Sequence, residues 1–365
     1  MDKNTGSAPM PSGMHDLDGE EISTTVTENK QQLQPEWKER FNMSSVVLIT
    51  GGAGSLGYEL TKQYLIAGYQ VRVYSRDEYK HWDLINKLSA DEDFRNQFTP
   101  ITAEFRDFVR MPFLPREMFG YLRLLIGDVR DAGRLNRALE GVDIVIHTAA
   151  LKQIESGEYN PQEVVKTNID GTQNVVDACI NNNVRYACLV SSDKAVNPSN
   201  LYGASKYMQE KLWLAGNNLK GSREMTFYGA RFGNLRGSKG SVWELFEKQK
   251  ETGIFTITDE KMTRFDYSLK DASEFIIKRE GTGVKPTIYI PKMKWYSIMD
   301  LPKLYHPNPK IEIIGLRSGE KLFEELVGEF EPVIEFDTHY KLGGDKYQSI
   351  RSGIDLDTKI TPTLE

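Results

Sequence analysis

The apolar positions of the chain fall into short continuous runs, separated by segments in which apolar residues recur every three or four positions. The runs occupy residues 46–49, 70–74, 121–126, 142–146, 186–190, 225–230 and 287–290. Short apolar runs are typical of buried strands, and the intervening period is typical of amphipathic helices. Strands that alternate with helices over short connections predict an α/β fold with a doubly wound parallel sheet.

The same pattern divides the chain into segments. Residues 1–43 are polar and lack apolar periodicity, so we expect a disordered N-terminal extension. Residues 44–230 carry the alternation and are expected to form a dinucleotide-binding domain, interrupted by a charged, aromatic insertion at 89–120. Residues 231–342 are expected to form a smaller, mixed α/β substrate-binding region, and residues 343–365 a tail.

Composition narrows the class of protein. The chain has 365 residues and a formal net charge of −6, which gives no electrostatic support for a nucleic-acid partner. Its two cysteines, Cys179 and Cys188, lie in a predicted helix and a predicted strand, so we expect buried thiols. No apolar run approaches the roughly 20 residues of a membrane span, and no signal peptide is apparent. We therefore expect a cytoplasmic protein, and no metal-ligand spacing is present.

A glycine-rich loop, TGGAGSLG at residues 50–57, follows the first apolar run and precedes a helical pattern. Glycines in a strand–loop–helix context allow a tight turn and a close approach to a pyrophosphate, which the helix amino end then faces. The loop therefore predicts a Rossmann-type dinucleotide site. The expected cofactor contacts are Gly51, Gly54, Ser55, Leu56 and Gly57.

The residues after the second and third runs are candidate contacts to the ribose and adenine parts of the dinucleotide. Ser75 and Arg76 stand where an acidic residue would bind a ribose 2′-hydroxyl, and a hydroxyl with a guanidinium suits a 2′-phosphate. We therefore expect NADP, although the nearby Asp77 keeps NAD open. Asp128 and Val129 follow the third run, where the adenine would lie.

Small residues follow the fourth run and allow the cofactor to lie against the backbone. These are Ala149 and Ala150, and Asn168 comes later on a predicted helix. His147 follows the same run directly, and we expect it to be packed rather than catalytic. Ala149, Ala150 and Asn168 are candidate cofactor contacts.

The stretch around the fifth run carries the candidate chemistry. Ser192 follows the run, and Tyr202 and Lys206 lie four residues apart at the start of a helical pattern, so they share one helix face. A phenol has a pKa of about 10, and a nearby ammonium favours the phenolate. Tyr202 is therefore a candidate base for a hydroxyl whose carbon gives hydride to a nicotinamide.

Asp193 and Lys194 stand directly beside this set. A plain alcohol dehydrogenase needs neither of them in addition to the tyrosine, lysine and serine. An acid next to an amine indicates a second proton transfer, such as the removal of water. The alternative is a surface ion pair of little energetic consequence.

The region after the sixth run gathers cations and small polar residues. Glycine, serine and basic residues are interleaved from Asn234 to Ser241, and Arg264 and Arg317 lie among apolar neighbours further on. In an acidic protein such clusters at loop positions indicate an anionic ligand, and a diphosphate fits them. These residues are the candidate substrate contacts.

Taken together, the motifs resemble one family. They are SRDE at 75–78, GDVRD at 127–131, AALK at 149–152, EYNP at 158–161, SDKA at 192–195, NLYGASK at 200–206, ITD at 257–259, MTRF at 262–265 and GEK at 319–321. The chain resembles, over residues 46–327, the extended short-chain dehydrogenase/reductases of the polysaccharide-biosynthesis type. Within them it is similar to the inverting UDP-N-acetylglucosamine 4,6-dehydratases.

The resemblance implies roles for the candidate residues. Tyr202, helped by Lys206, would take the proton of the 4-hydroxyl while NADP⁺ takes hydride from C4. Lys194 would remove the C5 proton, Asp193 would protonate the departing 6-hydroxyl, and the hydride would return to C6 with inversion at C5.

The family motifs add two residues to the expected binding site. Lys152 would contact both cofactor and substrate, and Glu320 would contact the UDP-sugar.

Two other functions stay open at this point. A nucleotide-sugar 4-epimerase shares the fold, the tyrosine and the lysine, but it needs no base at C5. A non-catalytic NADP-binding protein would also keep the fold, although such proteins often lose the tyrosine or the lysine. The resemblance also implies a homo-oligomer, either a dimer through the helices at 164–181 and 202–217 or a hexamer.

Overall fold

A computed structural model describes residues 45–97, 120–281, 284–343, 346–347, 350–352, 354–355 and 359–363. All of them belong to a single unit of the chain that spans Glu39–Glu365. The expected disordered extension at 1–43 lies outside the described residues, as does most of the expected insertion. Ser89, the expected first residue of that insertion, instead lies in the last turn of the helix α2 (Glu78–Ala90), and a short helix α3 (Glu92–Gln97) follows.

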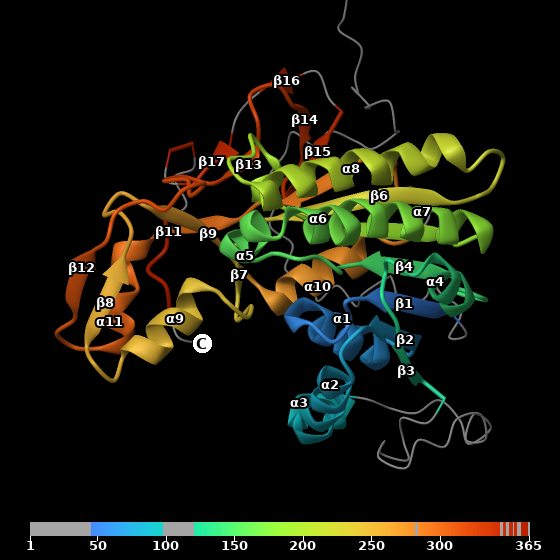
Figure 1. Cartoon of the computed structure of the whole chain (residues 1–365), viewed down its shortest axis with the longest axis horizontal. Helices are drawn as coiled ribbons and strands as arrows, with labels where there is room; N and C mark the ends of the chain where they lie inside the picture. Colours follow the sequence, from blue (N-terminus) through green and yellow to red (C-terminus); the bar gives the residue numbers. More distant parts are fainter. Residues whose placement is uncertain are drawn as a thin grey trace, which may run out of the picture. The chain divides into compact units, whose positions relative to one another are not determined.

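A parallel sheet forms the centre of the unit (Figure 1). Its parallel strands are β1 (Val46–Thr50), β2 (Gln70–Ser75), β3 (Leu122–Ile126), β4 (Ile144–His147), β5 (Tyr186–Ser192), β6 (Thr226–Phe232) and β10 (Ile288–Pro291). They lie in the order β3-β2-β1-β4-β5-β6-β10. The order reverses between β1 and β4, and this is the place where a doubly wound sheet binds its ligand. The predicted fold class is confirmed.

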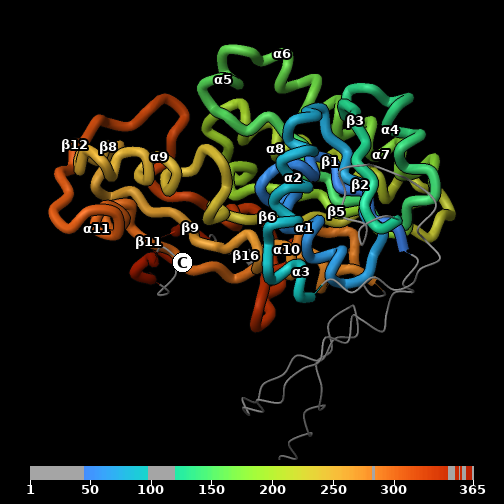
Figure 2. The backbone as a smooth tube through the Cα atoms, turned by 90° about the horizontal axis from the view of Figure 1, so that it is seen from below, coloured from blue at the N-terminus to red at the C-terminus, as the bar shows by residue number. Residues whose placement is uncertain are grey.

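Helices cover both faces of this sheet. They are α1 (Ser55–Ile66), α4 (Ala132–Ala138), α5 (Ile154–Tyr159), α6 (Pro161–Val164), α7 (Gly171–Asn181), α8 (Leu201–Leu219) and α10 (Leu269–Lys278), besides α2 and α3. Figures 1 and 2 show α7 and α8 on one face and α1 and α10 on the other. The predicted helix at 164–181 is not uniform, because a π-helical segment, Val165–Asp170, precedes α7.

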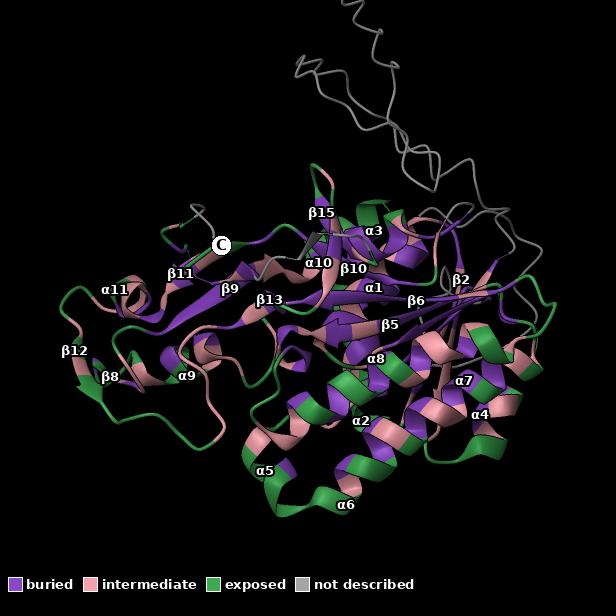
Figure 3. Cartoon of the chain, turned by 90° about the horizontal axis from the view of Figure 1, so that it is seen from above, coloured by how far each residue is buried: buried purple, intermediate pink, exposed green. Residues whose placement is uncertain are grey.

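The core of the sheet consists of apolar side chains without exposed surface. Strand residues such as Val47, Val145 and Leu189 are fully buried, and β6 is largely purple in Figure 3. Both cysteines, Cys179 and Cys188, are buried free thiols, as predicted. Burial on both faces explains why these strands have continuous apolar runs rather than alternating ones.

A smaller, mixed region follows β6, as predicted. Its elements are β7 (Leu235–Arg236), α9 (Val242–Gln249), β8 (Ile254–Ile257), β9 (Thr263–Ser268), β11 (Lys294–Ser297), α11 (Pro302–Tyr305), β12 (Lys310–Ile313) and β13 (Glu325–Val327). The strands form a β11-β9-β7 sheet and a β12-β8 pair. A separate apolar cluster, including Trp243, Phe246, Phe255 and Tyr296, holds this region together.

The expectation of a tail at 343–365 is wrong for part of that segment. Antiparallel strands β15 (His339–Leu342), β14 (Pro332–Glu335) and β16 (Lys346–Tyr347) extend the main sheet beyond β10, and β17 (Ile350–Arg351) pairs with β13. Ser352 is fully buried and bonds to the backbone of Glu324. The segment lacks apolar periodicity because its pairing partners, rather than its own side chains, fix it in place.

A buried cation links the main sheet to the C-terminal region. Arg231 on β6 has no exposed surface, and its guanidinium bonds to both carboxylate oxygens of Glu210 on α8 and of Glu331. It also donates to the carbonyl of Leu326 at 2.8 Å. Such a network is tolerated only because both carboxylates are hydrogen-bonded to the guanidinium, so the loss of Arg231 removes the cation that both of them bind.

We therefore expect Arg231→Met to destabilise the protein by about 3–5 kcal/mol, because Glu210 and Glu331 would lose the guanidinium that both of them bind. Urea unfolding followed by circular dichroism measures this loss. The matched control is Lys278→Met, which removes an exposed cation paired with Glu274 and should change stability by less than about 0.5 kcal/mol. An equal loss in the free energy of unfolding for both variants would contradict a special contribution of the Arg231 network to stability.

Candidate active site

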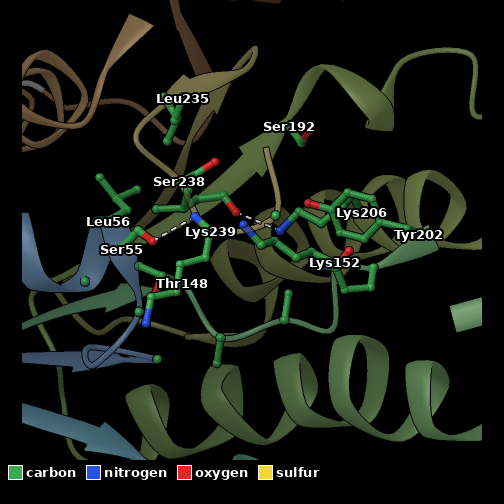
Figure 4. A pocket seen from close by; sticks show the side chains of 18 of the residues that line it. Ser55, Leu56, Thr148, Lys152, Ser192, Tyr202, Lys206, Leu235, Ser238 and Lys239 are labelled. Carbon is green, nitrogen blue, oxygen red and sulfur yellow. Dashed lines mark hydrogen bonds between the residues drawn. The ribbon is translucent and has the colours of Figure 1, made fainter. Parts of the chain in front are cut away.

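Two adjoining cavities lie at the carboxyl ends of the parallel strands. The first, of about 970 Å³, is lined by the glycine loop, by the ends of β2 to β5 and by the loop after β6 (Figure 4). The second, of about 670 Å³, lies toward β8, β9 and the loop before β13. Lys194, Asn234, Ser241, Arg317 and Glu320 line both. The side chain of Lys194 therefore stands where the two cavities meet.

The glycine loop has the geometry that a dinucleotide needs. A Cβ atom on Gly57 would lie 2.5 Å from the Cα of Gly52, and one on Gly51, where φ is +67°, would lie 2.8 Å from Thr148 Oγ1. The helix α1 begins at Ser55 without a side-chain cap, so its first amide groups are left for a ligand. The five predicted loop contacts, Gly51, Gly54, Ser55, Leu56 and Gly57, all line the first cavity.

The end of β2 also lines this cavity. Ser75 is bonded through its hydroxyl to His81 Nε2 at 2.7 Å, and Arg76 is about half exposed and lies 3.5 Å from a carboxylate oxygen of Asp128. The carboxylate of Asp77 accepts from the amide of Lys80 and so caps α2. Arg76 is thus available to an anion, while one oxygen of Asp77 is used by the helix.

The segment after β4 holds the predicted small residues. Ala149, Ala150 and Lys152 line the cavity, together with Val129 from the loop after β3. Burial lowers the pKa of Lys152. These positions agree with contacts to a bound dinucleotide.

Two other predicted positions support this segment from behind. His147 is packed between the hydroxyls of Thr50 and Thr172, as predicted, and burial lowers its pKa to about 3. Asn168 does not line the cavity: it is buried and bonds to the backbone of Leu151 and to Ser205. The side-chain amide of Asn168 therefore holds the loop around Leu151 against α8 and does not face a ligand.

The helix α8 is held at its first turn. Asn200 caps it by accepting from the amide of Gly203, and the carboxylate of Glu158 accepts from the amide of Leu201 at 2.7 Å. A Cβ atom on Gly203 would lie 2.3 Å from the carbonyl oxygen of Lys194. These contacts fix where Tyr202 and the next turn of the helix stand relative to the end of β5.

Tyr202 and Lys206 both reach the first cavity, as predicted (Figure 4). Lys206 Nζ donates to the carbonyl of Val190 at 2.7 Å, and burial lowers the pKa of Lys206 to about 8 although Glu210 opposes this. Burial also raises the pKa of Tyr202, and the nearby Lys194 lowers it only in part. The net direction is opposite to the sequence-based expectation, because loss of water from the phenolate outweighs the attraction of the ammonium.

Asp193 and Lys194 form an ion pair in which the carboxylate is fully buried and the lysine side chain is partly exposed. They lie in a single 3-10 turn, Asp193–Ala195, after β5, and Lys194 Nζ is 3.0 Å from Asp193 Oδ1. Lys194 reaches both cavities, whereas Asp193 has no exposed surface and lines neither. Ser192 donates its hydroxyl to Asp193 at 2.9 Å and lines the first cavity. A proton that leaves Asp193 for a ligand therefore has to pass through Lys194 or Ser192.

Glu324 is the site residue that sequence reasoning missed. Its Oε1 lies 3.2 Å from Lys194 Nζ, and it lines the second cavity. Burial opposes the Lys194 ammonium, but the carboxylates of Asp193 and Glu324 outweigh it and raise the pKa of Lys194. The signal was an acidic residue three positions past the GEK motif, close to a cluster of cations that needs a counter-ion.

The predicted substrate contacts lie around the two cavities. Arg264 is buried beside the second cavity, with Nη1 bonded to the carbonyls of Thr263 and Leu322, and Arg317 pairs with Glu155 at 3.2 Å. The loop after β6 crosses to the glycine loop, where the Lys239 amide donates to Ser55 Oγ (Figure 4).

Two polar atoms in this loop point to a polar ligand. Among the described residues, buried Asn234 Oδ1 and Ser241 Oγ have no hydrogen-bond partner. A buried polar atom without a partner is rare in a folded protein, so these atoms indicate where a polar ligand is expected to bind.

Fold and site together define a dinucleotide-binding protein of the tyrosine–lysine type with an additional acid–amine pair. A model of the family "Polysaccharide biosynthesis protein" matches residues 47–118 and 113–342. The chain belongs to this family.

Curated relatives and solved structures agree with this assignment. An inverting UDP-N-acetylglucosamine 4,6-dehydratase of Campylobacter jejuni is 38% identical over 309 residues, covering 83% of each chain. A UDP-glucose 4-epimerase of Rickettsia rickettsii is 34% identical over 299 residues, covering 79% of each.

Among solved structures, Pen from Bacillus thuringiensis is similar, with a TM-score of 0.73, 36% identity and coverage of 85% of this chain and 92% of that one. DesIV, a dTDP-glucose 4,6-dehydratase from Streptomyces venezuelae solved with NAD, has a TM-score of 0.62 at 21% identity, with 76% of this chain and 86% of that one covered. The latter similarity supports the fold alone.

Within the part of the chain that the structure describes, no helix is long and apolar enough to cross a membrane. The same residues contain no cluster of His, Cys, Asp and Glu side chains that could hold a metal ion.

We expect Gly57→Ala to weaken dinucleotide binding on the order of tenfold or more, because the new methyl group would collide with the loop backbone. Calorimetric titration of the protein with NADP and with NAD measures the affinity. The matched control is Gly133→Ala in α4, where the methyl group would meet only Asp131 Oδ1 at 3.5 Å and should leave binding unchanged. Undiminished binding by the Gly57 variant would contradict the assignment of the loop.

Proposed function

We propose that this chain is a hydro-lyase that removes water from UDP-N-acetylglucosamine and inverts C5, giving a 4-keto-6-deoxy sugar nucleotide for surface-glycan synthesis. The observation that carries the proposal is the acid–amine pair, Asp193 and Lys194, buried at the end of β5 beside Tyr202 and Lys206. Supporting it, relatives of the same length and about two-fifths identity carry this activity by name.

Each proton-transfer step is assigned to a residue in or next to the two cavities. Tyr202 takes the proton of the 4-hydroxyl, with Ser192 and Lys206 beside it in the first cavity. The resulting 4-ketone acidifies the C5 hydrogen, and Lys194 accepts that proton. Asp193 supplies the proton for the departing 6-hydroxyl through Lys194 or Ser192, which both line the first cavity. Because Lys194 lines both cavities, we expect it to lie between a cofactor in the first cavity and a sugar in the second.

A bound nicotinamide would accept hydride from C4 and return it to C6, so the reaction needs no external reductant. The glycine loop, Thr148 and Ala149 would hold it, since larger side chains would fill the same space. NADP rather than NAD is favoured by Arg76, which is half exposed at the end of β2 with Lys80 also lining the cavity.

The substrate contacts follow from the second cavity. Arg264, Arg317, Asn234 and Ser241 would bind the diphosphate and the sugar, with Lys152 and Glu320 beside them.

A homo-oligomer is proposed on the basis of the outer face of α8. Tyr207 and Met208 are more than two-fifths exposed there, and Leu219 is more than half exposed.

A UDP-sugar 4-epimerase is the second candidate, because named epimerases also match the chain. The two reactions differ in mass: dehydration makes the sugar nucleotide lighter by one water, and epimerisation leaves its mass unchanged. Incubation of the protein with UDP-N-acetylglucosamine, followed by mass spectrometry, separates them. We expect the loss of water.

Lys194→Ala should reduce water loss on the order of 10²- to 10⁴-fold, because it removes the group that accepts the C5 proton. Oxidation at C4 depends on Tyr202 and Lys206, so reduced cofactor should still form when substrate is added. Mass spectrometry follows water loss, and near-ultraviolet absorbance follows the cofactor. Lys87→Ala, an exposed lysine of α2 paired with Asp83, is the control and should behave like the wild type. Full turnover by the Lys194 variant would remove this residue from the chemistry.

Arg76→Ala should weaken NADP binding on the order of 10- to 100-fold, because a charge-assisted contact to the 2′-phosphate would be lost. NAD binding should change by less than about threefold, since NAD lacks that phosphate. Arg95→Ala, in the exposed helix α3, serves as the matched control. If the Arg76 variant lost affinity for both cofactors equally, the preference for NADP would rest on some other residue.

A further inference from the structure

The loop before β13 is held against the start of α8. The carbonyl oxygen of Gly319 accepts two hydrogen bonds, one from Asn200 Nδ2 at 2.9 Å and one from Ser199 Oγ at 2.8 Å. The partners are 119 and 120 positions apart in the sequence, so this contact depends on where the chain folds back. It links residues 315–320, which form neither helix nor strand, to the segment that leads into α8.

The side chain of Asn200 also caps α8. Its Oδ1 accepts from the amide of Gly203 at 2.8 Å, while its Nδ2 donates to Gly319. The cap fixes where the first turn of the helix begins, and Tyr202 lies in that turn, two residues after Asn200. One side-chain amide therefore holds both the loop and the helix that carries Tyr202.

The two segments approach each other closely at Gly319. Its backbone has a φ of +78°, and a Cβ atom on it would lie 2.9 Å from the Cβ of Asn200. Glycine adopts this conformation without steric cost and leaves space for the approach. The glycine of the GEK motif therefore serves the contact with Asn200.

Further links join the same segments. Lys321 Nζ donates to the carbonyl of Val196 at 2.6 Å. On α5, Glu155 pairs with Arg317 at 3.2 Å, and Glu158 accepts from the first amide of α8 at 2.7 Å. Residues three apart on a helix share one face, so α5 bridges the loop and α8.

The loop carries two of the side chains that are proposed to bind the UDP-sugar. Arg317 and Glu320 line both cavities, and Tyr202 lines the first. The amide of Glu320 donates to the carbonyl of Arg317 at 3.1 Å, and the amide of Arg317 donates to the carboxylate of Glu320 at 3.2 Å. Since Gly319 lies within this turn, its bond to Asn200 helps to fix where both side chains stand.

We propose that Asn200 is a positioning residue that sets the spacing between the loop at 315–320 and Tyr202, so that the 4-hydroxyl of a bound UDP-sugar lies at the phenol. This role rests on the proposed function, and specifically on the oxidation of a UDP-sugar at C4. It deepens that proposal, because it explains how a substrate held at its diphosphate is aligned at its sugar.

An error in this spacing reduces the rate of reaction. A displacement of about 1 Å at a reacting group costs on the order of 10²-fold, because the atoms leave the geometry in which they react. A loop without regular secondary structure depends on tertiary contacts such as those of Gly319 for its position. Ser199, Lys321 and α5 remain as further links, so loss of the Asn200 contact alone should cost less, on the order of tenfold.

The test is Asn200→Ser. Serine is as good a helix cap as asparagine, but its hydroxyl is too short to reach Gly203 and Gly319 together, so the cap stays and the link is lost. After mixing with saturating UDP-N-acetylglucosamine, we expect reduced cofactor to form about tenfold more slowly, as followed by stopped-flow absorbance. The affinity for UDP, measured by calorimetry, should change by less than about threefold, because UDP has no sugar to align with Tyr202. The melting temperature and the affinity for the cofactor should stay unchanged.

Three further variants make the result specific. Ser199→Ala removes the second donor to Gly319 without touching the cap, and should slow cofactor reduction by about threefold. Asn200→Ala removes both the cap and the link, and should lower the melting temperature as well as the rate. Asn308→Ser makes the matched change in an exposed bend outside both cavities and should behave like the wild type.

The outcomes separate the two proposals. If the wild type forms no reduced cofactor and removes no water, the proposed function falls and the role of Asn200 falls with it. A product of unchanged mass, with the tenfold effect present, would overturn dehydration and support the role of Asn200, because epimerisation also begins with oxidation at C4.

If the wild type is active and both Asn200→Ser and Ser199→Ala match its rate, only the role of Asn200 is overturned. A lower rate with an equally lower affinity for UDP or cofactor, or with a lower melting temperature, would also overturn it, since that is the result of a structural role. Should Asn200→Ser fail to fold, a wild-type rate in Ser199→Ala would decide against the proposal.

Discussion

The arrangement of the site depends on one ammonium group, that of Lys194, held between two buried carboxyl groups where the two cavities meet. Burying two carboxyl groups close together is unfavourable unless their charges are matched, so each one dictates what must stand beside it. Asp193 comes from the same turn, and Glu324 comes from a distant part of the chain. Arg264 completes the set from β9. The sheet end, the β9 strand and the loop before β13 therefore have to meet at this point.

Other contacts bring these elements together. Arg231 links β6 to α8 and to the segment after β13 through Glu210 and Glu331. Glu210 stands one turn after Lys206, so the same network also touches the tyrosine–lysine helix. Ser352 secures Glu324 from the C-terminal segment. The stability of the fold and the placement of the reacting groups consequently share the same buried charges.

The local parts of this arrangement could be predicted from the sequence. The parallel sheet follows from its apolar runs, and the glycine loop and Tyr202 with Lys206 follow from spacing along one element. Asp193 and Lys194 are neighbours in sequence, so their pairing could be predicted. The remaining features depend on contacts between segments far apart: Glu324 against Lys194, Glu331 against Arg231, and β17 against β13. No periodicity marks such contacts, because each depends on where the chain folds back.

Burial likewise changed the interpretation of residues that were correctly located. Tyr202 was expected to have a lowered pKa, and desolvation raises it instead. Asn168 was expected to face the cofactor, and it holds a loop. Asp193 was expected to touch the substrate, and it lies behind Lys194 and Ser192. In each case the residue type indicated what the side chain can do chemically, and only the packing showed which neighbouring group it contacts.

The central claim is that the buried Asp193 holds the proton that the departing 6-hydroxyl takes up. Infrared difference spectroscopy between the wild type and Asp193→Asn measures this directly, because a protonated carboxyl group has a carbonyl band that a carboxylate lacks. The account predicts such a band at neutral pH in the wild type and its absence in the variant. A difference spectrum that contains only carboxylate bands would contradict it.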